Sequence, residues 1–193
     1  MDDEAHTFAN AVRAIRLVKD LSLAELSMSS GVSRAMLSKV ERGEKSPTLP
    51  VACRIAQGLQ VSMSQLLGAD PAPDAFAITR LKQRLTFRDT DTGFCRELLS
   101  PPLESFGTEI LRHVVPAGQS SGDLPAYAPG FQKFVIVETG KIHVLTGNNE
   151  AELTQGDTLC FEPTENHQFS NHGSEECSYF VVTSRRPMRH NNI

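Results

Sequence analysis

The sequence has no run of 18 or more apolar residues, so it offers no candidate for a membrane-spanning helix. Residues 1–12 are acidic and lack an apolar stretch, so we expect no signal peptide and a cytosolic protein. There are only four cysteines, and no pair has the Cys-x-x-Cys spacing of zinc knuckles and redox motifs. We interpret them as small buried hydrophobic residues, with a redox-sensing thiol as the alternative: Cys53, Cys95, Cys160 and Cys177.

Basic residues do not dominate, because the net formal charge of the 193 residues is −4. The charge is unevenly distributed, however. The first 67 residues contain eight basic and seven acidic side chains, which gives +1 and leaves −5 for the remainder. Such an asymmetry is expected if only one part of the chain meets nucleic-acid phosphates. The surplus is small, so we expect modest nonspecific affinity that a dimer would increase.

Successive short helical patterns occupy residues 21–67. Ser22 and Glu25 have the spacing of a capping box, and Ser33 has the position of an N-cap before a second pattern. Gly31 permits the tight turn between the two helices. Apolar residues of the second pattern share one face, while its basic residues point outward. The stretch therefore predicts a helix-turn-helix, whose second helix can enter a DNA major groove.

Further helices are expected around this motif. One covers residues 7–19, another starts at Thr48 with Pro50 in its first turn, and a short one starts at Ser62 with Gln65 as its capping-box partner. Gly43 has the position of a helix C-terminal glycine. Three basic residues on the outer face of the first helix either contact the DNA backbone or form a solvated surface: Arg13, Arg16 and Lys19.

The run GVSRAMLSKVERGEKSPTLPVACRIAQGLQVSMSQLL resembles the Xre family of DNA-binding domains, the phage-repressor type of helix-turn-helix. The resemblance covers most of residues 9–67 and implies an all-α, five-helix bundle that binds double-stranded DNA. The alternative is a small helical bundle without a DNA-binding role. The resemblance implies a recognition helix over residues 33–42, with Glu41 in a structural or capping role.

Position in the family motif assigns the DNA contacts. The helix N-cap Ser33 and the residues Arg34, Ala35 and Lys39 fall at or near the base edges, with Ser38 close by. Arg34 can bond bidentately to guanine, and Ala35 can touch a thymine methyl. Three further residues are expected to contact phosphates, which position the protein without specifying sequence: Arg42, Lys45 and Thr48.

The hydrophobic period changes from helical to two after a proline-containing linker at residues 68–80. Alternating segments separated by glycine, proline and asparagine turns predict an all-β barrel or sandwich. They cover residues 81–87, 94–98, 109–115, 134–138, 142–145, 159–161, 167–169 and 179–182. We therefore expect a multidomain protein: helix-turn-helix domain 1–67, linker 68–80, all-β domain 81–186 and a frayed basic tail 187–193.

Residues 140–142, 153–163 and 167–171 resemble the cupin family over roughly residues 106–183. The resemblance implies a double-stranded β-helix, or small jelly roll, with a central pocket. A phage-repressor-type head joined to a cupin also resembles a recurrent bacterial regulator arrangement.

Metal-binding cupins use three histidines and one glutamate. In this sequence the glutamate position is Lys133, the first histidine positions fall in residues 124–129, which contain no histidine, and His167 remains. One imidazole beside a lysine lacks the donors that Zn²⁺ or Fe²⁺ requires, so we predict no metal, no cofactor and no catalysis. The alternative is a site rebuilt from other strands by His113, His143 and His172.

Lysine in place of a metal-binding glutamate reverses the local charge of the pocket. A carboxylate, sulfonate or phosphate of a small-molecule effector can pair with Lys133, with Tyr127, Gln132 and His167 as hydrogen-bond partners. The alternative is a Lys133 side chain that points to solvent or forms an internal ion pair.

Together these patterns predict a transcriptional regulator that binds a DNA operator as a homodimer, with a cupin domain that senses a small metabolite and supplies the dimer contact. Two alternatives remain open. One is a metal-dependent cupin enzyme, a dioxygenase or isomerase, that carries a DNA-binding head. The other is a cupin that serves only for dimerisation.

Overall fold

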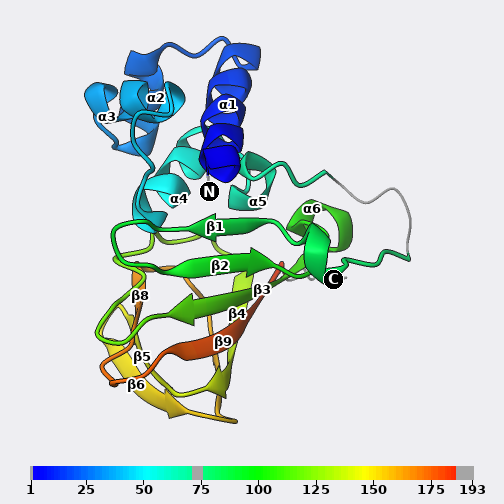
Figure 1. Cartoon of the computed structure of the whole chain (residues 1–193), viewed down its shortest axis with the longest axis vertical. Coiled ribbons are helices and arrows are strands. Elements are labelled where there is room, and N and C mark those ends of the chain that lie inside the picture. Colours follow the sequence, from blue (N-terminus) through cyan, green and yellow to red (C-terminus); the bar gives the residue numbers. More distant parts are fainter. Residues whose placement is uncertain (1, 71–75, 186–193) are drawn as a thin grey trace, which may run out of the picture.

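The start and stop signals in the sequence set the boundaries of the N-terminal helices. The computed structural model describes residues 2–70 and 76–185, and its first five helices form one bundle (Figure 1). They are α1 (Asp2–Val18), α2 (Leu23–Ser30), α3 (Arg34–Glu41), α4 (Leu49–Gly58) and α5 (Met63–Leu66). None of the described helices combines the length and apolar character needed to cross a membrane.

The predicted caps of α2, α3 and α5 are confirmed. The Ser22 hydroxyl accepts the Glu25 N–H at 3.2 Å, and the Ser22 N–H donates to the Glu25 carboxylate at 2.7 Å. Ser62 and Gln65 form the same reciprocal pair at the start of α5. Gly43 follows the C-cap Arg42 and has φ of 70°, and its N–H donates to the Val40 carbonyl, so a left-handed glycine ends α3.

An ion pair links α1 to α3. Arg16 donates to both oxygens of Glu41 at 2.6 and 2.9 Å and to the Leu21 carbonyl at 2.7 Å. The Arg16 and Glu41 side chains are only 12% and 7% exposed. The structural role expected for Glu41 is therefore confirmed, while the placement of Arg16 on the outer face of its helix is wrong. Apolar periodicity alone does not reveal that a long basic side chain can fold back onto a neighbouring helix.

The second part of the chain is made of antiparallel strands in a six-stranded and a three-stranded sheet, in the orders β1-β2-β3-β9-β4-β7 and β6-β5-β8. The expected order of an all-α bundle followed by an all-β part is confirmed. The strands are β1 (Thr86–Arg88), β2 (Cys95–Leu98), β3 (Thr108–Val115), β4 (Phe131–Thr139), β5 (Lys141–Thr146), β6 (Asn149–Thr154), β7 (Thr158–Phe161), β8 (His167–Ser170) and β9 (Cys177–Arg185).

Several expectations differ from the structure. The strand expected at residues 81–87 begins only at Thr86, and Leu81–Gln83 forms a 3₁₀ turn in which Leu81 is 72% exposed. Alternation without a buried face does not make a strand. The sequence patterns did not predict β6 or the short helix α6 (Leu103–Phe106). Cys160 is exposed rather than buried. Parts of the expected linker and tail, residues 71–75 and 186–193, lie outside the described residues.

Aromatic side chains form part of the core of the β part. The His113 ring lies 5.1 Å from Phe94, 5.2 Å from Tyr179 and 6.2 Å from Phe169 between ring centroids. Phe94, Phe169 and Tyr179 are fully buried. Burial also lowers the pKa of His113 well below its usual range, which keeps the ring neutral in this core.

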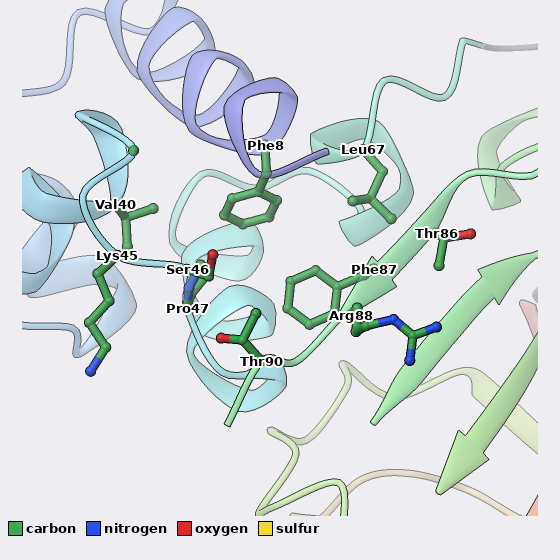
Figure 2. A pocket seen from close by; sticks show the side chains of 11 residues that line it. Phe8, Val40, Lys45, Ser46, Pro47, Leu67, Thr86, Phe87, Arg88 and Thr90 are labelled. Carbon is green, nitrogen blue, oxygen red and sulfur yellow. The ribbon is translucent and has the colours of Figure 1, made fainter. Parts of the chain in front are cut away.

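The two parts pack against each other directly. Helices α4 and α5 lie beside β1 in Figure 1. The ring centroids of Phe8 in α1 and Phe87 in β1 lie 6.1 Å apart, and both residues line a cavity of about 70 Å³. Figure 2 shows the two rings side by side. Gln57 of α4 donates to the Ala126 carbonyl at 2.7 Å. These contacts join the helical bundle to the β part.

Candidate nucleic-acid interface and interdomain cavity

Helix α3 presents a polar face to solvent. Ser33 caps this helix by accepting the Met36 N–H at 3.3 Å, while Leu37 and Val40 are buried against the bundle. The predicted base readers Arg34, Ala35 and Lys39 are exposed, and Ser38 is half-buried. In Figure 1 α3 lies at the outer edge of the bundle, away from the sheets. The helix is therefore accessible along the side that a DNA groove would meet.

The predicted phosphate contacts follow α3 directly. Arg42 donates to both oxygens of Glu44 at 2.5 and 2.8 Å and also to the Ser38 hydroxyl, so a phosphate must displace Glu44 to reach it. Lys45 is exposed, and Figure 2 shows its side chain directed away from the Phe8–Phe87 contact. Thr48 is half-buried at the N-cap of α4, where its side chain makes no capping hydrogen bond.

Three of the four predicted ligand residues meet in the β part. Lys133 Nζ lies 2.8 Å from His167 Nε2 and 4.4 Å from the centroid of the Tyr127 ring. Lys133 is 5% exposed, so the alternative that it points to solvent is wrong. Gln132 precedes Lys133 on β4 and thus faces the other side of the sheet, and it is not among the residues that line the cavity described below.

The protonation of this pair follows from its burial. Burial lowers the pKa of Lys133 to about 7. Nearby Arg96 also lowers this pKa, whereas Cys53 and Glu109 raise it. Burial and the Lys133 charge lower the pKa of His167 to about 3, so the imidazole is neutral at physiological pH. His167 Nδ1 lies 3.4 Å from the Glu165 carbonyl, which suits an Nδ1–H donor. His167 Nε2 is then free to accept a hydrogen bond from Lys133.

A cavity of about 660 Å³ lies between helices α4 and α5 on one side and strands β2, β3, β4 and β9 on the other. Arg96 and Glu109 form a buried ion pair in its wall, with Nη2 and Oε2 at 3.0 Å. Ser64 of α5 donates to the other Glu109 oxygen at 2.5 Å. Tyr127, Lys133 and Thr183 line the cavity too. The remaining wall is mostly apolar and comes from both domains: Ala56, Val61, Met63, Leu103, Leu124 and Phe131.

Sequence reasoning missed Arg96, Glu109 and Thr183. A signal was present, because Glu109 and Thr183 occupy inward positions of alternating strands, where polar side chains are unusual. Their partners could not be read from the sequence, since strand pairing decides which inward positions become neighbours.

The donor set does not fit a divalent metal. Beside His167 stands a lysine amine rather than a carboxylate. His113 lies in the aromatic core, and His143 stacks on His172 at 5.2 Å, so these histidines do not converge with His167. Across residues 2–70 and 76–185 no three His, Cys, Asp or Glu side chains are grouped to hold a metal ion. The side chains around His167 therefore do not support a metal-dependent step.

Two family models match the chain. Residues 12–66 match the helix-turn-helix family HTH_3, and residues 111–183 match the cupin domain family Cupin_2. The HTH-type transcriptional regulator SutR of Escherichia coli strain K12 is 26% identical over 189 residues, which cover 93% of this chain and 95% of SutR.

One solved structure shows the same arrangement. A crystal structure of an HTH_3 family transcriptional regulator from Vibrio cholerae has a TM-score of 0.79 and 25% identity, and the match covers 97% of this chain and all of that one. Hydroxypropylphosphonic acid epoxidase from S. wedmorenis is also similar, with a TM-score of 0.48, 20% identity and coverage of 95% and 100%. A likeness this distant carries no functional argument.

Proposed function

We propose that this protein, which joins an Xre-type helix-turn-helix domain to a Cupin_2 domain, is a transcriptional regulator that binds a specific DNA operator as a homodimer. The observation that carries the proposal is helix α3, whose Arg34, Ala35 and Lys39 face solvent while Leu37 and Val40 anchor it. Similarity to SutR along almost the whole chain supports the same function.

The DNA contacts divide into two groups. On α3, Arg34 would donate two hydrogen bonds to a guanine, Ala35 would contact a thymine methyl, and Ser33, Ser38 and Lys39 would lie along the same groove. Lys45, Arg42 and Thr48 would contact phosphates, which fix the register of the helix. In the free protein Glu44 pairs with Arg42. Arg42 would therefore attract a DNA phosphate fully only after the phosphate replaces Glu44 as its partner.

A homodimer would bring two such helices to one operator, since one helix-turn-helix reads too few base pairs for specific control. The outer face of the larger sheet supports this part of the proposal. Side chains from β3, β9 and β4 that point away from the core form an apolar patch: Ile110, Phe134, Ile136, Phe180 and Val182. Ile110 and Ile136 are each 38% exposed, and a second copy of the patch would cover them.

The cupin domain would act as the sensor. Its cavity is lined by residues of both domains, including Ala56 of α4 and Met63 of α5. A small molecule in this cavity would touch the DNA-binding domain and the cupin at once. It would change DNA affinity to the extent that it binds one relative orientation of the domains better than another. Tyr127 and Lys133 line the cavity and would contact the ligand. His167 does not line it and would act through its hydrogen bond with Lys133, and Gln132, on the other face of β4, would have no part.

We propose no catalytic role for the cupin. Cupin chemistry of the dioxygenase type needs three or more metal donors, and the lysine–histidine pair does not supply them. Use of the cupin for dimerisation alone would leave the interdomain cavity without a ligand.

The test is selection of bound duplexes from a random DNA pool with the purified full chain. The expected result is one enriched, two-fold symmetric motif with half-sites about 10 base pairs apart, bound by two copies of the chain. A chain that enriches no motif, or binds every duplex equally, would contradict the proposal.

A further inference from the structure

Polar side chains form a row across the inner face of the larger sheet, at the floor of the interdomain cavity. Glu109 of β3 is paired with Thr183 of β9, and Thr183 is paired with Lys133 of β4. Directly opposed residues of antiparallel strands have Cβ atoms about 5 Å apart. Arg96 of β2 joins the row through its ion pair with Glu109. These four residues are between 3% and 6% exposed.

The row has one positive charge in excess. Both oxygens of Glu109 are used, one by Arg96 and one by Ser64. Lys133 contacts only neutral groups in the described part of the chain, the His167 ring nitrogen and the Tyr127 ring. Glu109 and Cys53 favour the charged amine without a contact to it. A buried ammonium with no carboxylate in direct contact is unfavourable.

Two neighbouring donors lack an acceptor. Within the described residues, Arg96 Nη1 and Thr183 Oγ1 are buried and have no hydrogen-bond partner. Both residues line the cavity together with Lys133. The three residues that carry these donors thus line one cavity, and an anionic oxygen is the group that would satisfy all three donors.

We infer that the interdomain cavity binds a small monocarboxylate with an apolar body, whose carboxylate accepts hydrogen bonds from Lys133, Arg96 and Thr183. A single negative charge matches the single excess positive charge of the row. The apolar body follows from the rest of the lining, to which Val61, Leu124 and Phe131 contribute. The inference rests on the proposed sensor role and gives the ligand a chemical class.

Such a ligand would connect the site to the DNA-binding domain. Its apolar body would lie against Ala56 and Met63 of α4 and α5, and its carboxylate would lie beside the Arg96–Glu109 pair that Ser64 of α5 already contacts. Binding would therefore favour the present orientation of the two domains, to the extent that the ligand binds this orientation more tightly than any other.

The lysine makes binding depend on pH in a defined direction. The pKa of Lys133 is about 7 in the absence of a ligand, and a carboxylate beside it raises that pKa. Only the protonated amine pairs with the carboxylate, so the affinity for the ligand reaches its maximum as the pH falls below 7. As the pH rises above 7, affinity falls by up to about tenfold per pH unit, because binding must then take up a proton.

The experiment is isothermal titration calorimetry of the full chain with hexanoate and phenylacetate, using hexanamide as the neutral control, at pH values of about 6 and about 8.5. Variants Lys133→Met and Thr183→Val remove one donor each while keeping side-chain size. Lys141→Met is the matched control, because Lys141 is an exposed lysine on β5 whose nearest carboxylate is Glu152.

The expected result is binding of at least one acid but not of the amide, weaker at the higher pH. Lys133→Met should weaken it roughly 10- to 100-fold and Thr183→Val roughly 3- to 10-fold, with Lys141→Met unchanged. Absence of acid binding, equal binding of the amide, or unchanged binding by Lys133→Met would overturn the inference. DNA selection with the same preparation keeps the two questions apart: an enriched operator without acid binding removes this inference alone, and acid binding without an operator removes the regulator proposal alone.

Discussion

The Asp89 carboxylate accepts the backbone N–H of Leu49 at 2.9 Å, so a cupin residue caps the first turn of a helix in the DNA-binding domain. Asp89 is 2% exposed, and its other oxygen accepts the N–H groups of Asp91 and Thr92. Thr48 holds the N-cap position, but the cap itself comes from 40 residues further along the chain. The link ties α4, which follows the recognition helix, to the loop after β1.

Asp89→Ala should therefore destabilise the contact between the domains as well as the helix. We expect a loss of about 1–2 kcal/mol in the free energy of unfolding, the usual cost of losing a helix cap. Chemical denaturation followed by circular dichroism measures it. Asp91→Ala, which removes an exposed carboxylate of the same loop, should change stability by less than about 0.5 kcal/mol. Equal effects of the two substitutions would contradict the capping role.

Gly122 should be intolerant of a side chain because it lies against the helical bundle. It has φ of 68°, and an added Cβ would lie 2.7 Å from Pro50 Cγ in α4. Gly118 has nearly the same φ, 67°, but an added Cβ there would meet nothing within 4 Å. Gly118→Ala thus reports the backbone strain alone, about 1 kcal/mol, and Gly122→Ala should cost measurably more in thermal unfolding. If both variants unfold alike, the domains do not pack as closely in solution.

Arg34→Ala and Lys45→Ala should separate base reading from phosphate contact. On the selected operator, Arg34→Ala should lose about 1–3 kcal/mol, and the loss should shrink on duplexes changed at one base pair. Lys45→Ala should weaken all duplexes alike and reduce the salt dependence of binding by about one unit of slope. Fluorescence anisotropy at several salt concentrations measures both. A uniform loss for Arg34→Ala would show that Arg34 contacts phosphate instead.

Ile136→Glu should disrupt the proposed dimer. The substitution places a carboxylate in the apolar patch on the outer face of β4. Dimer formation would bury this charge without a partner, which is unfavourable. We expect a shift from dimer to monomer in sedimentation velocity and weaker operator binding. Leu145→Glu on β5 is the control, because Leu145 has the same 38% exposure on the other sheet. A variant Ile136→Glu that remains dimeric would place the dimer contact elsewhere.

Much of the helical domain could be predicted because its signals are local. Ser22 with Glu25, Ser62 with Gln65, and Gly43 each act within one turn of their own helix, so neighbouring residues carry all the information. The alternation of β3, β4 and β9 indicates which residues face inward for the same reason. The lysine at residue 133 was likewise recognisable as a change of charge in a family motif.

Partnerships between distant residues were decided only by the tertiary structure. Strand register sets Lys133 beside Thr183 and Thr183 beside Glu109, and a shift of one residue would turn all three to the other face. The packing of α1 on α3 brings Arg16 into contact with Glu41. The packing of the two domains brings Asp89 into contact with Leu49, and Ser64 into contact with Glu109. The sequence by itself determined most of the elements and their buried faces, because these depend on neighbouring residues; β6 and α6 are the exceptions. The site depends on which strand and helix faces pack against each other. That packing minimises the free energy of the whole folded chain, so no local stretch of sequence determines it.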